Sequence, residues 1–364
     1  MENIKEKIIE RLLKLGLTKN EAKAYVALLE LEVASPLEIA EFTGIPVSRV
    51  YFVLSSLSKK GFVESQRGRP KLYRAINPRI ALRLLTEKYI KTQEEALNLI
   101  NGLTFRSRMI ETKTFWIIKG RKNIIERVRS LIMSSKIEIM LATKDKTIMV
   151  DLVRDVQKAI NKGLNVSMVA YKSSEQITKQ IIKKFRKDTA LRIRDMFAPS
   201  VFIFDNKIGL VYITESLRRG STTKIETALL IENEEFLPIF KSYYQLRIWY
   251  TSKPYMSYAH YFSRPRTYLT FFRAVEDAEY LLSKNIPVRA YVEGWLLNSK
   301  KRRKILAGKV VGVYNSSDHS VYNITLKTNE GKQYVLGGKG CMIEPFETDK
   351  ITLIPLKKLK ENNS

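Results

Sequence analysis

The sequence is poor in the residues that carry most metal binding and nucleophilic catalysis. Its 364 residues include one cysteine, Cys341, and two histidines, His260 and His319. One cysteine excludes an intramolecular disulfide, and these residues are too few for a tetrahedral zinc site. We therefore predict no metal, no other cofactor, and an intracellular, reducing environment.

Long apolar runs and phosphate-binding loops are also absent from the sequence. No run approaches the roughly 18 apolar residues that a membrane-spanning helix needs, and the N-terminus MENIKEKIIERLLKLG lacks the apolar region of a signal peptide. No GxxxxGK[ST] or GxGxxG pattern occurs, so the sequence lacks the glycine-rich loops that bind the phosphates of nucleotides, and a nucleotide-dependent function is not expected. We expect a soluble, cytoplasmic protein without membrane contact.

Positive charge is abundant and spread along the whole chain. Lys and Arg exceed Asp and Glu by 27 in total, by 5 in residues 1–105, by 13 in 106–250 and by 9 in 251–364. Such a surplus favours polyanionic partners, with nucleic acid as the leading candidate. The length predicts about two or three domains, so the basic surface extends over more than one of them.

The first 77 residues have the pattern of a winged helix-turn-helix domain. Capping patterns at Thr18 (TKNE) and Ser35 (SPLE) start two helices, and Gly44 ends the second. The run PVSRVYFVLSSLSKK then forms a third helix with one apolar and one polar face. After it, FVESQRGRPKLYRAI gives two short strands joined by a basic turn, which is typical of a winged hairpin.

Duplex DNA is the partner that this arrangement predicts. Ser48 and Arg49, near the start of the third helix, would meet base edges in the major groove, while the cations of the hairpin would lie near phosphates. Phe52 could contact a thymine methyl group, although an aromatic at helical spacing is more often core or interface. The alternative is a winged module that binds protein, with a solvated Arg-Gly-Arg turn. The predicted DNA-binding residues are Pro46, Ser48, Arg49, Tyr51, Phe52, Lys59, Lys60, Arg67, Arg69 and Lys71.

From Pro78 onward, apolar residues recur at alternating steps of three and four. This spacing predicts a long helix with a coiled-coil seam of about three heptads. We therefore predict a homodimer through residues 78–104, which would present two recognition helices to a pseudo-palindromic site. The alternative is a helix packed on its own chain, because Thr92 and Ala96 weaken the seam. The seam consists of Leu82, Leu85, Tyr89, Thr92, Ala96, Leu99 and Leu103.

The remaining sequence predicts two further domains. Residues 111–252 alternate strand-like and helical stretches, which indicates parallel strands with helices on both faces, closed by a helix over 234–250. Residues 253–364 predict a helix from about Thr267 to Ser283, then several short strands that form a small β-barrel. The fold class is thus α+β multidomain: a winged helix-turn-helix over 1–77, a dimerisation helix over 78–110, an α/β domain over 111–252 and a β-barrel over 253–364.

Several short motifs are similar to those of one known family. Gly44-Ile45-Pro46 leads into Val50-Tyr51, Lys59-Lys60-Gly61 ends the third helix, and Arg69-Pro70 precedes Tyr73-Arg74-Ala75. These motifs resemble those of the TrmB family of archaeal sugar-responsive transcription regulators. The resemblance covers about residues 15–355.

The resemblance implies a phospholipase-D-like fold for the α/β domain. It is carried there by Arg194, Pro199 and Phe204-Asp205. Phospholipase D chemistry needs a histidine nucleophile, and residues 111–252 contain no histidine. Glu226 and Glu232 would lie about 20 Å apart along a strand, too far for a glycosidase pair. We therefore predict that the protein is not an enzyme.

The resemblance also implies a sugar site between the α/β domain and the barrel. The matching positions offer amide and carboxylate groups for sugar hydroxyls and a glycine where the backbone must approach the ring. An aromatic ring, that of Trp295, could serve as a flat platform, as could Trp249 or Tyr250, although buried core is the commoner place for each. The alternative is that Gly337-Gly338 forms a bulge and Glu344 a surface ion pair. The predicted effector-binding residues are Asn323, Gly338, Glu344 and Trp295.

Together these patterns predict a homodimeric, sequence-specific DNA-binding regulator. The resemblance further implies that a small effector, expected to be a sugar, binds the C-terminal domains and alters operator affinity. The alternative is an architectural protein that coats DNA without an effector, which the charge outside the winged domain favours, the basic run Lys300–Lys304 included.

Overall fold

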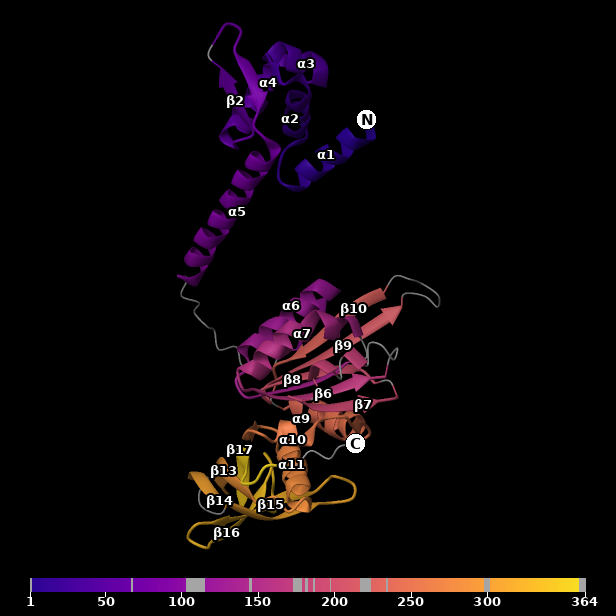
Figure 1. Ribbon diagram of the computed structural model, residues 1–364, viewed down its shortest axis with the longest axis vertical. Coiled ribbons are helices and arrows are strands. Elements are labelled where there is room, and N and C mark those ends of the chain that lie inside the picture. The colour runs from indigo at the N-terminus through magenta and orange to yellow at the C-terminus, as the bar shows by residue number, and fades with distance from the viewer. Residues whose placement is uncertain are drawn as a thin grey trace. The chain divides into compact units, whose positions relative to one another are not determined.

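The computed structural model shows two compact units, residues 1–110 and 111–364 (Figure 1). It describes residues 2–66, 68–102, 115–143, 146–172, 179–180, 183–185, 187–196, 198–216, 224–233, 235–297 and 302–359. Within these ranges no helix is both long enough and apolar enough to cross a bilayer.

The first unit is the winged helix-turn-helix domain that the sequence predicts, followed by a long helix. Both predicted capping boxes are present, at Thr18 and at Ser35. Gly44 ends the second of these helices with a φ of 69°, a left-handed conformation that glycine adopts without strain. The elements are α1 (Glu2–Lys14), α2 (Lys19–Leu31), β1 (Val33–Ala34), α3 (Pro36–Thr43), α4 (Val47–Lys59), β2 (Val63–Gln66), β3 (Leu72–Ala75) and α5 (Pro78–Asn101), with sheet order β1-β3-β2.

The core of this unit fixes α4 and the hairpin relative to α2. Leu54 and Leu57 of α4 are fully buried against this core. The rings of Tyr25 and Phe62 meet edge to face, with centroids 5.0 Å apart, and the Tyr25 hydroxyl donates to the carbonyl of Ile76 at 2.8 Å. The recognition helix and the wing are therefore held on one rigid body.

Helix α5 divides into a half that packs on its own chain and a half that does not. Ala81 and Leu85 are buried in the core of the first unit, and the Tyr89 hydroxyl donates to the carbonyl of Leu15 at 3.0 Å. Residues 86–102 are all exposed. The first part of the helix thus packs against its own chain, which was the alternative to a dimer seam. Leu103, the last predicted seam residue, lies outside the described residues.

An eight-stranded sheet forms the first layer of the second unit. Among the described strands β5, β6 and β7 pair in parallel, so the prediction of parallel strands is confirmed for β5 and β6 and is wrong for β4, which pairs antiparallel with β10. Asp205 and Asn206, at φ values of 45° and 54°, make a short turn between β8 and β9, and short turns impose antiparallel pairing. The order is β11-β7-β6-β5-β8-β9-β10-β4, with β4 (Phe115–Lys119), β5 (Glu138–Thr143), β6 (Asn165–Tyr171), β7 (Ala190–Arg194), β8 (Ser200–Phe204), β9 (Ile208–Ser216), β10 (Lys224–Ile231) and β11 (Lys253–Pro254).

Helices cover both faces of this sheet. Helices α6 (Arg121–Ser134) and α7 (Lys146–Asn161) pack on one face. On the other, α9 (Leu237–Ser242) continues directly into the π-helix η1 (Tyr243–Trp249), so the closing helix predicted over 234–250 is present, although it begins later and its second half is π-helical. Pro238 lies in the first turn of α9, a position that suits proline only at a helix start, and this places the start later than predicted.

A closed five-stranded barrel forms the second layer. The strands β13 (Val288–Leu296), β14 (Arg302–Asn315), β15 (Tyr322–Thr328), β16 (Gln333–Gly337) and β17 (Phe346–Pro355) pair in order, and β16 closes the barrel against β17. The predicted barrel is thus confirmed. Helix α11 (Phe271–Ser283) begins four residues later than predicted, because β12 (Arg266–Tyr268) pairs with β17 instead.

One hydrophobic core joins the two layers of the second unit. It runs from Met140 and Val169 on the sheet, through Phe272 and Val275 of α11, to Ile324 inside the barrel. A short helix, α10 (Tyr258–Tyr261), contributes to the same core. The α/β layer and the barrel therefore pack as a single unit.

Candidate DNA-binding surface and domain junction

The exposed face of α4 carries most of the residues that the sequence assigns to DNA. Ser48 and Arg49 are exposed at its N-terminal end, and Pro46 caps it without a side-chain hydrogen bond. Phe52 is 79% exposed and Tyr51 is 54% exposed, so neither belongs to the core. The core alternative for Phe52 therefore does not hold, because Val53 and Leu54 occupy the inner face, while a contact with DNA or with another protein surface stays a prediction. These side chains give the surface a cation from Arg49, hydroxyl groups from Ser48 and Tyr51, and the rings of Tyr51 and Phe52.

The two lysines at the end of α4 differ in their contacts. Lys59 is exposed. Lys60 donates to Glu21 Oε2 at 2.7 Å and to the Gly16 carbonyl at 3.3 Å, and Ser56 donates to Glu21 Oε1 at 2.6 Å. Burial raises the pKa of Glu21, but the donors from Lys60, Ser56 and Thr18 outweigh it and hold the pKa below its usual value. Lys60 therefore stabilises the fold of the domain through its ion pair with the buried Glu21.

The hairpin presents its cations beside α4. Arg69 and Lys71 are exposed in the turn, and the Lys71 ammonium lies 5.2 Å from the centre of the Tyr73 ring. Arg74 pairs with Glu64 on the neighbouring strand at 2.5 Å. Arg67 lies outside the described residues. The described cations of the turn are thus exposed on the surface.

Three of the four predicted effector residues lie at one end of the barrel, around the start of α11. A Cβ atom at Gly338 would lie 3.2 Å from Phe271 Cβ, and one at Gly337 would lie 2.8 Å from Glu344 Oε2. Tyr322, the neighbour of Asn323, has its ring 6.1 Å from that of Phe271. The glycines thus permit close contact with α11 and with Glu344. Asn323 alternates with the buried Ile324 and Leu326, so its side chain points out of the barrel interior.

Trp295 lies apart from the other three. Its indole nitrogen donates to Asp349 Oδ2 at 2.8 Å across β13 and β17. No described contact joins it to Gly338 or Glu344. The indole therefore occupies the outer surface of the barrel.

Helix α9 and η1 bring further polar side chains to the end of the barrel. Gln245 donates to the His319 carbonyl at 3.2 Å, and the Tyr250 ring stacks on His319 at 3.6 Å. The pKa of Tyr322 is raised, mainly by burial. A hydrogen bond with Gln245 lowers this pKa, and the charge of Glu344 raises it further. Burial lowers the pKa of Lys241, which the charge of Glu138 raises. We call this region, Lys241, Gln245, Tyr322, Gly338 and Glu344, the junction.

Sequence reasoning did not identify Lys241 and Gln245. A four-residue spacing of polar side chains in an otherwise apolar helical stretch is the signal that could have found them. Its weakness is that the same spacing also describes an ordinary solvated helix face.

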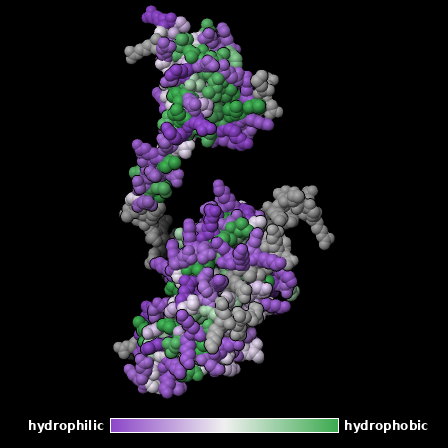
Figure 2. Space-filling view, viewed as in Figure 1, coloured by the Kyte–Doolittle hydropathy of each residue, from purple (hydrophilic) through white to green (hydrophobic). Residues whose placement is uncertain are grey.

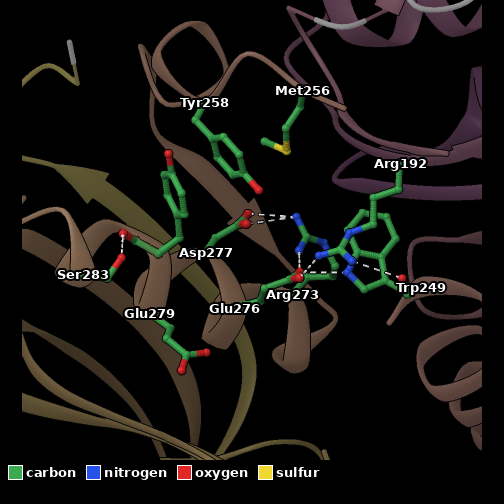
Figure 3. A pocket seen from close by; sticks show the side chains of 10 residues that line it. Arg192, Trp249, Met256, Tyr258, Arg273, Glu276, Asp277, Glu279 and Ser283 are labelled. Atoms are coloured by element: carbon green, nitrogen blue, oxygen red, sulfur yellow. Dashed lines mark hydrogen bonds and ion pairs between the residues drawn. The ribbon is translucent and has the colours of Figure 1, made fainter. Parts of the chain in front are cut away.

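A second site between the layers is a cavity of about 380 Å³ (Figure 3). Its floor is a charged network around Trp249. The guanidinium groups of Arg192 and Arg273 lie 4.6 and 4.3 Å from the Trp249 ring, and the indole nitrogen donates to Glu276 at 2.8 Å. Both arginines also donate to Glu276, and Arg273 donates to Asp277 at 3.0 Å.

This network ties β7, η1 and α11 together. Its charges are mutually paired, as buried charges must be. None of the predicted effector residues lines the cavity. We therefore assign the network a structural role. Trp249 is buried in the core, the commoner place for such a side chain, and is not a sugar platform.

Glu138 provides a further buried contact between the layers. Its Oε2 accepts from the backbone N–H groups of Leu269 and Thr270, at 3.1 and 2.8 Å, just before α11 begins. Burial raises the pKa of Glu138 to about 7, and the donors of Leu269 and Thr270 oppose that rise. The carboxyl group thus changes charge near neutral pH.

Comparison with known proteins assigns all three segments to one family. The model "Sugar-specific transcriptional regulator TrmB" matches residues 12–79, the TrmB "EBD N-terminal subdomain" matches 114–255, and the TrmB/TrmBL1 "EBD C-terminal subdomain" matches 263–355. Within the described residues, no group of three or more His, Cys, Asp and Glu could hold a metal ion.

Individual relatives match parts of the chain. The sugar sensing transcriptional regulator TrmBL1 of Pyrococcus furiosus is 36% identical over 140 residues, 38% of this chain and 41% of its own length. The DNA-binding transcriptional repressor TrmBL2 of Thermococcus kodakarensis is 30% identical over 227 residues, 56% of this chain and 83% of its own. The solved structure of TrmBL2, described as an archaeal chromatin protein, is 26% identical, covers 68% of this chain and 98% of that one, and has a TM-score of 0.41. A phospholipase D family member is among the other matching structures, at 16% identity and a TM-score of 0.33.

Proposed function

Because this chain belongs to the TrmB family of transcriptional regulators, we propose that it binds a specific operator and that a small effector, a sugar, alters its operator affinity. The observation that supports this most directly is the exposed face of α4 beside the basic hairpin. Arg49 and Ser48 can reach base edges there, while Arg69 and Lys71 neutralise phosphates. No step of catalysis is part of this proposal.

The proposed regulator is a homodimer through residues 78–104. The exposed second half of α5 supports this, because Leu97 and Ile100 are each about half exposed and Leu99 is 76% exposed. Apolar side chains at helical spacing are stabilised by a facing helix. Two paired helices would place two recognition helices about one DNA turn apart.

The effector is proposed to bind at the junction. Glu344 and Gln245 offer groups that can share two sugar hydroxyls, and Gly338 lets Phe271 of α11 pack closely beside them. The name of the Pyrococcus relative, a sugar sensing regulator, supports a sugar as the ligand. Coupling requires that the sugar prefer one state of the dimer, and a preference of about 100-fold corresponds to roughly 2.7 kcal/mol.

Genome-wide footprinting with and without a panel of sugars tests the function. We expect a few protected sites whose occupancy changes with one sugar. Glu344→Ala should lose the sugar response and keep operator affinity, whereas Glu330→Ala, in an exposed turn of the barrel, should keep both. Protection that is uniform along the DNA, with no sugar effect, would contradict the proposal.

The second candidate is an architectural protein that coats DNA. The observation that favours it is the charge surplus of 13 in residues 106–250 and 9 in residues 251–364, outside the winged domain. Such a surface would bind phosphates without regard to sequence. Its footprint would lack discrete sites.

A further inference from the structure

Strand β4 ends the eight-stranded sheet and exposes apolar side chains at that edge. Among the strands that the structure describes it pairs only with β10, with Ile117 opposite Leu229. Phe115, Trp116 and Ile117 are three consecutive apolar residues with exposed fractions of 41%, 54% and 66%. The visible face of the second unit is otherwise mainly hydrophilic (Figure 2). An exposed, apolar edge strand is uncommon, because it offers free backbone groups to any passing strand.

Both faces of β4 contribute to this apolar edge. On one face, the Phe115 ring meets that of Phe236 edge to face at 5.0 Å, and Ile239 of α9 is 60% exposed. On the other face, Trp116 and Ile118 line a shallow cavity of about 470 Å³ with Leu230 and the ion pair of Arg127 and Glu232. A partner that continued the sheet would cover the edge and both faces together.

The devices that usually protect an edge strand are scarce here. Natural edges carry charged residues, prolines or bulges that prevent further pairing. In β4 only Lys119, at the end of the strand, is charged, and the register against β10 is regular over all five residues. The edge is therefore built to accept a strand.

We propose that β4 pairs antiparallel with β4 of a second copy of this chain, so that two eight-stranded sheets join across a two-fold axis. The five-residue strand is self-complementary about Ile117. In that register Ile117 of each copy faces its equivalent, Trp116 faces Ile118, and Phe115 faces Lys119. A two-fold contact of one surface with itself is the commonest way in which soluble homodimers form.

The length of the chain before β4 favours a second copy as the partner. Residues 103–114 separate Gly102, the cap of α5, from Phe115. A chain of this length spans at most about 45 Å when extended. The α5 dimer proposed above would thus hold two β4 strands near each other, and a tethered contact needs little area of its own because its effective concentration is high. The inference draws on that dimer only for this tether.

Disulfide formation in the full chain tests the pairing. The chain has a single native cysteine, so Cys341→Ser gives a background without thiols. In it, Ile117→Cys should form a covalent dimer on mild oxidation, since opposed residues of antiparallel strands lie about 4.5 to 5.5 Å apart, within disulfide range. The control is Val150→Cys, because Val150 of α7 is 58% exposed and lies away from the edge. We expect at least about tenfold more dimer from Ile117→Cys, as tethering predicts.

A parallel variant separates this inference from the proposed α5 dimer. Ala96→Cys, in the same background, reports pairing of the seam. Dimers from Ala96→Cys but only control levels from Ile117→Cys would overturn the β4 contact and leave the α5 dimer standing. Dimers from Ile117→Cys alone would support the β4 contact and contradict the α5 dimer. Unchanged tryptophan fluorescence in each variant verifies that the second unit is folded.

Discussion

Arg49 and Lys60, near the two ends of α4, show how differently two cations of one helix can be used. Lys60 is bound by Glu21 and by the Gly16 carbonyl, and its loss would leave a buried carboxylate with one donor fewer. Arg49 is exposed beside Ser48. Substitution of Lys60 should therefore lower the stability of the domain, and substitution of Arg49 should weaken DNA binding.

The first prediction concerns Arg49. Arg49→Ala should weaken operator binding by about 1 to 3 kcal/mol and relax the preference at one base position, because a bidentate guanidinium discriminates guanine by about that amount. Binding to operator and random duplexes at fixed salt measures both effects. Lys60→Ala is the matched control and should lower the melting temperature of the first unit with little change in base preference. Equal weakening on both duplexes would identify Arg49 as a phosphate contact.

The second prediction concerns the pH dependence of the second unit. The folded-state pKa of Glu138 is raised to about 7 from an ordinary value of 4.5. The stabilisation is therefore complete below about pH 4.5 and is lost as the pH rises through about 7. From this shift we expect a loss of about 3 kcal/mol of unfolding free energy between pH 4.5 and pH 8, as an order of magnitude.

Glu138→Gln tests this assignment, because glutamine keeps an acceptor for Leu269 and Thr270 without a charge. The variant should be more stable than the parent at pH 8 and should lose the trend with pH. Denaturant titration followed by tryptophan fluorescence is a clean measurement, since Trp116, Trp249 and Trp295, the only tryptophans, all lie in the second unit. The control Glu330→Gln should retain the trend, and a trend that persists in Glu138→Gln would refute the assignment.

At the residue scale, sequence patterns identify exposed groups better than their partners. The polar face of α4 follows from helical spacing, so Ser48 and Arg49 could be placed on it in advance. The engagement of Lys60 could not, because it depends on Glu21, thirty-nine residues away. The place of Trp295 on the outer barrel surface depends likewise on the bulge beside Gly294 and on Asp349.

At the scale of elements, the second half of α5 leaves apolar side chains exposed, with Leu99 at 76%. Ala96→Glu with Leu99→Glu, two exposed residues of the predicted seam, should abolish the proposed dimer and lower operator affinity by about 100-fold or more, since one tethered half-site is lost. The same pair of substitutions should leave the melting of the first unit unchanged, because both side chains are exposed. Light scattering and operator titration measure the two effects. Glu87→Gln with Glu94→Gln is the control pair on exposed positions of the helix, and a dimer that survives the glutamates would place the interface elsewhere.

Element order was more predictable than sheet direction. The winged domain, α5 and the barrel follow from capping residues, heptad spacing and regular turns, which are local signals. The direction of β8, β9 and β10 depends on tight turns within a sheet that also contains parallel strands, and alternation of strands and helices does not report it. The predicted helix includes residues 267–268 of β12, which form a strand instead because pairing with β17, a distant segment, overrides the local preference.

At the scale of the whole molecule, the charge surplus raises the question of selectivity. If the chain is a regulator, its affinities for operator and random DNA should differ by about 1,000-fold or more at physiological salt. If it coats DNA, both should fall steeply and equally with salt. Titrations of both duplexes between about 50 and 200 mM salt, over which six to ten phosphate contacts would lose about 1,000-fold or more in affinity, decide between them. A ratio near one at every salt concentration would rule out the regulator.

The continuous core through α11 limits how a bound sugar can act. Separating the barrel from the α/β layer would expose Phe272, Val275 and their neighbours to water. The free-energy cost would be about 25 cal/mol for each Å² of apolar surface exposed. A few hydroxyl contacts cannot supply that much, since coupling free energies are typically about 1 to 3 kcal/mol. We therefore expect a bound sugar to rigidify the second unit without separating its α/β layer from its barrel. Any effect on operator binding should then come from a change in the position or mobility of the whole second unit.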